Sequence, residues 1–393
     1  MEGRTRVSYE GNPGYLKRVG SSLSGVLVGI VLLFVASGVL FWNEGRAVQT
    51  AKSLDEGLSM VVPLKSPNVI SLDNEGKLVH FIGNVQTSKV LSDPEYNIAV
   101  QAVKLKRIVE MYQWIEHERE RKYDEGNGKT RVEKEYTYSQ EWRTDVVKST
   151  GYDDAFNHRN PSSMSVAAKS LVADQVDVGQ FSLSDGLVSK ISNFKQLPID
   201  HRYKPGRTDV QMFDGYIYHS KNPIQPETGD IRIKFEYAGI SGQSSLGPQM
   251  TVTIVARQIN GKVLPYQTVA GDQLEILYEG KLSPKEVFGR EKAQNTLLTW
   301  GIRLAGWLVM FVGFSCLTKI IATLVDWVPI VRDLVAAGVT LMNVSLAISW
   351  SLTVIAFGWI YYRPLLGIGI LAMAMTPFVM SRWSRGSTSR RVD

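Results

Sequence analysis

The chain has 393 residues, of which 44% are hydrophobic and 21% are charged, with a formal net charge of +6 and one cysteine. The single cysteine, Cys316, excludes an intrachain disulfide. Residues 44–303 hold 33 basic and 33 acidic side chains, so the positive excess lies entirely in residues 1–43 and 304–393, where the most hydrophobic stretches also lie. This distribution is typical of membrane flanks and excludes nucleic acid as an expected partner.

The first hydrophobic stretch is predicted to cross a membrane. Residues 23–42 contain no ionisable side chain, and 20 residues of helix span about 30 Å of hydrocarbon. A cleaved signal peptide is the alternative, because Ala36, Ser37 and Gly38 are small enough for a peptidase site. The apolar core is longer than the usual 7 to 15 or so residues, and 22 residues precede it, so a retained helix is favoured.

Three more spans are predicted near the C-terminus, at residues 304–325, 338–360 and 364–381. The second span includes Lys319, which can extend its ammonium group to the interface. Residues 326–337 form the expected loop between spans two and three, and residues 382–393 form a basic tail. The turn between spans three and four contains Arg363 and Pro364. The chain is therefore predicted to be a four-span protein of the α+β class.

The charges orient these spans. Basic side chains precede span one and follow span four, so residues 1–22 and 382–393 are predicted to be cytosolic or nucleoplasmic, and residues 43–303 lumenal. The expected interface anchors are Lys17, Arg18, Lys319, Arg363, Arg382 and Arg385. The lumenal region has no cysteine and no usable Asn-x-Ser/Thr signal, which argues against a typical cell-surface domain. The opposite topology remains the alternative.

The region 43–303 is predicted to be a mainly antiparallel β-rich domain. Residues 108–123 and 131–147 are rich in β-branched and aromatic residues and flank a turn around Gly126, which predicts a long hairpin. Its charges indicate a solvated arm with cross-strand pairs, and a partner-docking arm is the alternative. A short helix is expected at residues 184–197. Further strands are expected at residues 79–82, 171–178, 215–219, 231–237, 250–259 and 273–278, with a turn at Asn260 and Gly261 leading into 262–265.

A stalk helix is predicted to begin at about residue 284. Ser283 and Glu286 form a capping box, with Pro284 at the first helical position. Between Pro284 and Gly301 the only glycine is Gly289 and there is no proline, so this helix is expected to continue into span two. The domain would then be rigidly coupled to the membrane.

No chemical site is evident. The five histidines are scattered without metal-ligand spacing, no phosphate-binding loop or nucleophile elbow occurs, and no pair of carboxylates stands out. An enzyme is not expected, and neither a cofactor, a metal nor a small-molecule substrate is predicted.

Small and polar residues in the spans are candidates for helix packing. Ser21, Gly25 and Gly29 lie on one face of span one, either for intramolecular packing or for dimerisation. Asn343 and Ser349 of span three are expected to hydrogen-bond neighbouring helices. The charged groups around residues 319–333 are interpreted as interfacial anchors, with ion passage as the alternative.

The chain resembles the LUMA family, also called transmembrane protein 43. The resemblance begins at Asn43, Glu44, Gly45 and Arg46 and continues in order through residues 91–94, 109–114, 235–242, 256–258, 286–288, 324–327 and 362–365. It implies a four-span protein of the endoplasmic reticulum membrane and the inner nuclear membrane that self-associates and organises envelope complexes with emerin and lamins. It supplies no catalytic residues.

These observations together predict a non-enzymatic membrane scaffold that helps maintain the nuclear envelope and the endoplasmic reticulum. The expected partners are other copies of the chain, membrane lipids, and emerin-like and lamin proteins. An ion channel, or a subunit that modulates one, is the alternative.

Overall fold

The computed structural model describes residues 4–11, 15–124, 129–199, 204, 207–324 and 329–365; within these ranges, side chains are described except at residues 15–23, 124, 320–324 and 329–336. The chain divides into two units. The β-rich unit comprises Met1–Asn12, Met60–Tyr266 and Leu274–Pro284, and the helical unit comprises Pro13–Ser59, Gln267–Gln273 and Lys285–Asp393.

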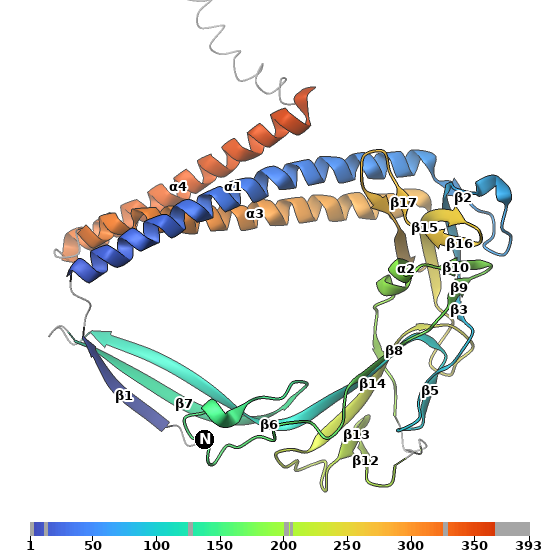
Figure 1. Ribbon diagram of the computed structural model, residues 1–393, viewed down its shortest axis with the longest axis horizontal. Helices are drawn as coiled ribbons and strands as arrows, with labels where there is room; N and C mark the ends of the chain where they lie inside the picture. Colours follow the sequence, from blue (N-terminus) through green and yellow to red (C-terminus); the bar gives the residue numbers. More distant parts are fainter. Residues whose placement is uncertain are drawn as a thin grey trace, which may run out of the picture. The chain divides into compact units, whose positions relative to one another are not determined.

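The larger sheet of the β-rich unit is built on a long hairpin (Figure 1). Its central strands are antiparallel, and β14 alternates buried and half-buried residues because one face covers a core that includes Leu105, Ile233 and Phe235. Its strands are β1 (Arg4–Gly11), β6 (Ala102–Asp124), β7 (Lys129–Arg143), β8 (Lys169–Val172), β11 (Lys195–Gln196), β12 (Gln211–Phe213), β13 (Tyr216–His219) and β14 (Ile231–Ile240).

The second sheet closes on itself. Strands β3, β9, β10, β16 and β15 pair in a closed circuit around a second core, in which the rings of Phe81 and Phe181 stack with centroids 4.8 Å apart. Closure leaves few unpaired edges. The strands are β2 (Val62–Pro63), β3 (Leu78–Thr87), β9 (Val176–Val178), β10 (Phe181–Leu183), β15 (Thr251–Ile259), β16 (Lys262–Leu264) and β19 (Ile276–Glu279). Two short pairs are β4 (Leu91–Asp93) with β5 (Ile98–Val100), and β17 (Tyr266–Gln267) with β18 (Gln273–Leu274).

The turn at Asn260 and Gly261 has the conformation that its sequence predicts. Both residues have positive φ, 47° and 74°, and they join β15 to β16 as a hairpin. Two other sequence interpretations are wrong in extent. The predicted strand 171–178 is two strands, since β8 pairs with β6 and β9 pairs with β3. The predicted helix 184–197 is only α2 (Asp185–Lys190), because Ile191 is extended and β11 then pairs with β14.

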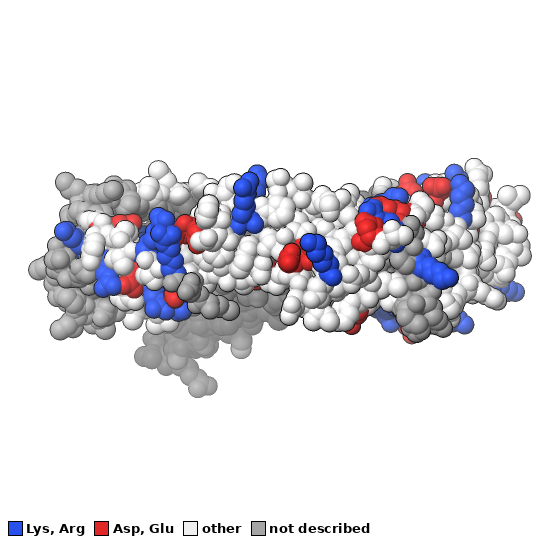
Figure 2. All heavy atoms as spheres, turned by 90° about the horizontal axis from the view of Figure 1, so that it is seen from below, with Lys and Arg blue, Asp and Glu red and all other residues white. Residues whose placement is uncertain are grey.

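The hairpin arm, formed by residues 108–123 of β6 and 131–143 of β7, carries cross-strand ion pairs. Lys134 contacts Glu118 at 2.6 Å and Glu120 at 3.6 Å, and Tyr138 donates to Glu116 at 2.7 Å. The face of the molecule in Figure 2 shows basic and acidic side chains side by side, without one large patch of a single sign. The arm therefore has the solvated, paired character that its sequence predicts. The turn around Gly126 lies outside the described residues.

The N-terminal segment contains a strand that the sequence analysis did not predict. Residues Arg4–Gly11 form β1, which pairs antiparallel with β7 from Arg4 opposite Tyr136 to Gly11 opposite Lys129. Every residue of β1 is exposed. Paired strands share one side of a membrane, so this pairing and a span at residues 23–42 that separates the N-terminus from the β-rich unit exclude each other.

In its described residues, the helical unit contains three long helices, α1 (Tyr15–Met60), α3 (Pro284–Leu324) and α4 (Pro329–Tyr362). Within the described residues, three segments are long and apolar enough to cross a membrane: Ser24–Met60, Pro284–Lys319 and Ala337–Tyr362. They overlap the first three predicted spans. The fourth, at 364–381, lies beyond residue 365 and so almost wholly outside the described residues.

Two predicted boundaries in this unit are wrong. Helix α1 does not end with the apolar stretch at Trp42 but continues to Met60, so residues 43–59 form a helical stalk that belongs to the helical unit and not to the β-rich unit. The apolar positions Ala47, Val48, Ala51 and Leu54 recur at helical spacing and carry this signal. The loop predicted at 326–337 is shorter, because α4 begins at Pro329. Helix α3 begins at Pro284, where the capping box predicts it.

Candidate functional site

The motif Asn43 to Arg46 lies where α1 leaves its charge-free stretch, and its side chains join the three helices. Glu44 is buried, with 2% of its surface exposed. Its carboxylate accepts hydrogen bonds of 2.7 Å from both Nε and Nη2 of Arg303 on α3. It also accepts a 2.8 Å bond from the indole Nε1 of Trp359 on α4. One carboxylate thus ties all three helices together.

The Glu44–Arg303 pair has the geometry that a buried ion pair needs. Two parallel N–H···O bonds match the planar guanidinium to the carboxylate, and the indole satisfies a further lone pair. The side chains of Arg303 and Glu44 are only 13% and 3% exposed. Removing one partner would leave an uncompensated buried charge, which typically costs about 3 to 5 kcal/mol.

Arg46 forms a second network beside the first. Its guanidinium donates to Asn295 Oδ1 at 2.9 Å, to Thr299 Oγ1 at 2.9 Å and to Asn43 Oδ1 at 3.2 Å. The Asn43 amide donates to the Thr299 carbonyl at 3.2 Å, and the Asn295 amide donates to the Ala47 carbonyl at 3.0 Å. We call Asn43, Glu44, Arg46, Asn295, Thr299, Arg303 and Trp359 the helix clamp. It fixes the register of α1 against α3.

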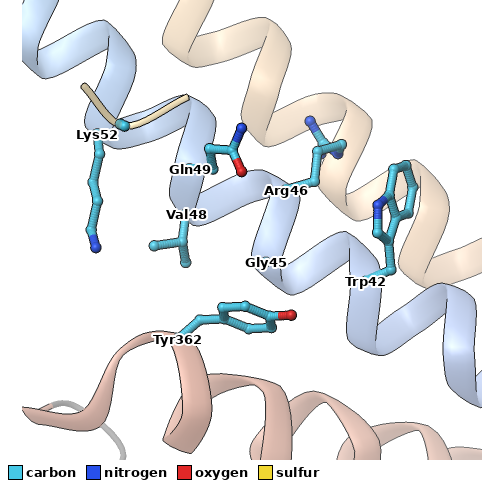
Figure 3. Close-up of a pocket in the computed structure, with 8 residues that line it drawn as sticks. Trp42, Gly45, Arg46, Val48, Gln49, Lys52 and Tyr362 are labelled. Atoms are coloured by element: carbon cyan, nitrogen blue, oxygen red, sulfur yellow. The ribbon is translucent and has the colours of Figure 1, made fainter. Parts of the chain in front are cut away.

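Two glycines allow the close approach of α4 to the clamp. A Cβ on Gly45 would lie 2.5 Å from the ring of Tyr362, and a Cβ on Gly358 would lie 2.9 Å from Glu44 Cβ. Figure 3 shows the Tyr362 ring facing Gly45 from α4, with Trp42 and Arg46 nearby on α1. The role of Gly45 in the motif is therefore steric.

The clamp lies where the charge-free stretches of the three helices end. Arg303 directly precedes the charge-free part of α3, and Arg363 directly follows that of α4, at the same level as Glu44 on α1. Aromatic side chains gather at this level, and those of Trp42, Trp300 and Tyr361 are exposed. Arginine beside tryptophan and tyrosine is typical of the interface between hydrocarbon and water.

Two cavities flank the clamp. The first has a volume of about 480 Å³ and is lined by Trp42, Gly45, Arg46, Gln49 and Tyr362, among others (Figure 3). The second has a volume of about 400 Å³ and lies on the side of Glu44 and Arg303. Both fall within the size range of small-ligand sites.

Within the charge-free stretches, three of the packing candidates, Gly25, Gly29 and Asn343, contact another helix of the same chain. A Cβ on Gly29 would lie 2.7 Å from the carbonyl oxygen of Gly313, and Gly25 faces Cys316. Asn343 is buried and donates to Thr318 Oγ1 at 2.8 Å, joining α4 to α3. Ser349 does not pack between described helices, because its side chain is exposed. Of the two uses of the small face, the structure shows the intramolecular one at Gly25 and Gly29.

Most of the predicted anchors lie outside the described side chains. Lys319 is exposed and Arg363 is half-buried. The structure does not describe the side chains of Ser21, Lys17, Arg18, Arg382 and Arg385. The motif residues were selected by family likeness, but their partners Asn295, Thr299, Arg303 and Trp359 were not anticipated. The only sequence signal for these partners is that Arg303 and Trp359 lie near the edges of charge-free runs.

The β-rich unit contains a charged cluster that the sequence analysis missed. Arg107, 8% exposed, contacts Glu95 at 2.6 Å and Asp93 at 3.0 Å. Tyr96 Oη lies 2.9 Å from His219 Nε2. Burial raises the pKa of Tyr96 to about 12 and lowers the pKa of His219, while the hydrogen bond from Arg107 lowers the pKa of Glu95. Among the described residues, no group of His, Cys, Asp and Glu could hold a metal ion.

Comparison with known proteins gives a consistent result over most of the chain. The family model described as transmembrane protein 43 matches residues 111–364. Human transmembrane protein 43 is 43% identical over 378 residues, which is 96% of this chain and 94% of the human protein. The transmembrane protein 43 homolog of Drosophila melanogaster is 35% identical over 358 residues, 89% of this chain and 92% of the fly protein. No solved structure matches the chain.

Proposed function

Because this chain belongs to the transmembrane protein 43 family, we propose that it is a non-enzymatic scaffold of the endoplasmic reticulum and inner nuclear membrane. In this role it organises protein complexes that maintain the nuclear envelope. Its partners are other copies of the chain, membrane lipids, and emerin-like and lamin proteins at the basic ends.

The observation that carries this proposal is the helix clamp. The spans of α1 and α3 continue without a break into a stalk outside the hydrocarbon, and the clamp locks the two helices at the boundary. A scaffold needs membrane helices that keep a fixed register, and a locked pair of helices provides this better than helices joined only by a flexible linker.

The helical unit also includes a loop, Gln267–Gln273, that is held on the same stalk. Residues 267–273 contact α1 through three polar links: Ser53 Oγ lies 2.9 Å from Thr268 Oγ1, Glu56 accepts from the Val269 amide, and Gln49 donates to Asp272 at 2.6 Å. These links lie within the helical unit and tie its loop to α1. This arrangement favours mechanical coupling over chemistry.

Proximity labelling tests the proposed location and partners. A labelling enzyme fused to the C-terminal tail is expected to enrich inner nuclear membrane and lamina proteins. A labelled set confined to the plasma membrane or to secretory vesicles would rule out the nuclear-envelope role.

Reconstitution distinguishes the scaffold from an ion channel. Purified protein in liposomes is expected to give no ion flux above that of empty liposomes. Flux that is abolished by substituting polar residues of α4, such as Asn343→Leu, would replace the scaffold with a channel.

An engineered glycosylation acceptor in the turn around Gly126 tests the topology. It is expected to be modified, whereas an acceptor in residues 382–393 is expected to stay unmodified. The reverse pattern would show that the orientation derived from the charges is inverted.

A further inference from the structure

The second cavity beside the clamp has a composition that the scaffold role does not explain. It lies among α1, α3 and α4 and has a volume of about 400 Å³. Its lining combines the cations Lys292, Arg303 and Arg363 with the indoles of Trp300 and Trp359. Both kinds of group are typical of sites for negatively charged, partly apolar ligands.

The charges of this cavity do not balance. Its two carboxylates, Glu44 and Asp55, are paired with Arg303 and Lys292, the former at 2.7 Å and the latter at 2.5 Å. Among the described residues, Arg363 has no carboxylate within ion-pair distance, and its backbone amide continues the helix by donating to the Trp359 carbonyl at 2.8 Å. The cavity thus keeps one positive charge for a ligand.

The position of the cavity selects the kind of anion. Arg303 and Arg363 border the charge-free parts of α3 and α4, so the cavity opens at the hydrocarbon boundary. The apolar side chains of Leu304, Leu308 and Phe357 are exposed on the hydrocarbon side of the same two helices. A ligand here can place a phosphate against Arg363 and two acyl chains along these side chains.

We propose that this cavity binds the phosphate headgroup of an anionic glycerophospholipid in the leaflet on the stalk side. Arg363 supplies the charge for the phosphate. Trp300, 63% exposed, and Trp359 flank the glycerol region, where indoles are favoured. This lipid site does not depend on the scaffold role. It is argued only from the cavity, its net charge and its position at the ends of the charge-free parts of α3 and α4.

Lipid retention by the full-length protein tests this proposal. The purified chain in neutral detergent is mixed with equal amounts of dioleoyl phosphatidic acid and dioleoyl phosphatidylcholine, and bound lipid is counted by native mass spectrometry. The wild type is expected to prefer the anionic lipid by about fivefold or more, roughly the gain from one additional charge pair. Excess inorganic phosphate is expected not to displace the bound lipid.

Three variants locate the binding. Arg363→Gln is expected to reduce the preference to near unity, and Arg363→Lys to retain most of it. Lys52→Gln is the matched control, since it removes one positive charge from the exposed stalk but lines the first cavity. It is expected to leave the preference unchanged.

Each outcome bears on the proposal. Equal retention of the two lipids by the wild type would overturn the proposal. This result needs no variant, so the test does not depend on whether Arg363→Gln folds. Equal loss in Arg363→Gln and Lys52→Gln would reduce the effect to general surface charge. Displacement by inorganic phosphate would make the site one for a free anion.

Discussion

Glu44 and Arg303 are separated by 259 positions in the chain, yet the carboxylate of one accepts two 2.7 Å hydrogen bonds from the guanidinium of the other. The pair lies where the charge-free stretches of α1 and α3 end, and it joins the helix that leads into the β-rich unit to the helix that follows that unit. The ion pair therefore fixes the register of α1 against α3.

Glu44→Gln is expected to destabilise the protein by about 3 to 5 kcal/mol, because Arg303 would remain buried without a counter-charge. The double variant Glu44→Gln with Arg303→Met is expected to lose much less than the two single changes added together. Thermal unfolding of the detergent-purified protein, followed by tryptophan fluorescence, measures this coupling. Additive losses would mean that the two charges stabilise the helices independently.

Gly45→Ala is expected to destabilise the helical unit by about 1 to 3 kcal/mol, because the new methyl group would overlap the Tyr362 ring. Gly289→Ala on α3 is the matched control. Outside its chain neighbours and its own helix backbone, no described atom lies within 4 Å of the position of its Cβ, so the higher helix propensity of alanine should stabilise the helix by up to about 1 kcal/mol. The same unfolding assay compares them. A loss of similar size in both variants would contradict the steric role of Gly45.

His219 is expected to make the β-rich unit sensitive to mild acid. Burial lowers the pKa of His219 below its usual 6.5, so the unfolded chain takes up the proton at higher pH than the folded chain. The stability from neutral His219 is therefore present above pH 6.5 and is lost as the pH falls through the lowered pKa. Urea unfolding of the full chain between about pH 7.5 and 5 should show this decline.

His219→Gln should flatten that decline, whereas His117→Gln should not, because the side chain of His117 is 53% exposed. The carboxylates near His219 do not titrate in this pH range. The pKa values of Glu95 and Asp209 are lowered from 4.5 and 3.8, so their contributions to the stability of the folded chain are lost only at lower pH. Identical profiles for wild type and His219→Gln would assign the acid sensitivity elsewhere.

A cross-linking experiment distinguishes two arrangements: one in which α1 spans the membrane and separates β1 from β7, and one in which β1 pairs with β7. Insertion of a 20-residue apolar helix gains several kcal/mol, whereas β1 is exposed at every residue and its hydrogen bonds do little more than offset its ordering entropy. We therefore expect that Val7→Cys and Glu133→Cys, which are opposite each other in the register, do not form a disulfide in the membrane-inserted protein, with Cys316 replaced by serine.

The pair Arg119→Cys and Glu135→Cys is the positive control, since these residues are opposite each other within the β6–β7 hairpin. It is expected to cross-link in the same membranes under mild oxidation. Efficient cross-linking of residues 7 and 133 would place the N-terminus on the side of the β-rich unit and exclude a span that separates them.

The sequence by itself determined the features that depend on neighbouring residues. Charge-free runs located three helices that are long and apolar enough to cross a membrane, because a charged group inside hydrocarbon is costly whatever surrounds it. The capping box placed the start of α3 at Pro284, and the Asn260-Gly261 pair placed a tight hairpin, because both signals act within a few residues.

Local signals failed where distant partners decide. Residues 171–178 form an apparently continuous strand in sequence, but the chain bends near Asp174 so that its halves join different sheets. Helix 184–197 stops at Lys190 because Lys195 and Gln196 gain backbone partners in β14. Helix α1 continues past Trp42 because Ala47, Val48 and Leu54 are buried.

Only the tertiary structure could give the family motif a role. The sequence marks Asn43 to Arg46 only as a string of residues. In the structure, Glu44 accepts hydrogen bonds from Arg303 and Trp359, and Gly45 leaves room for the ring of Tyr362. A buried charge is stable only beside a partner, and the partner is fixed by how three helices pack rather than by any spacing along the chain.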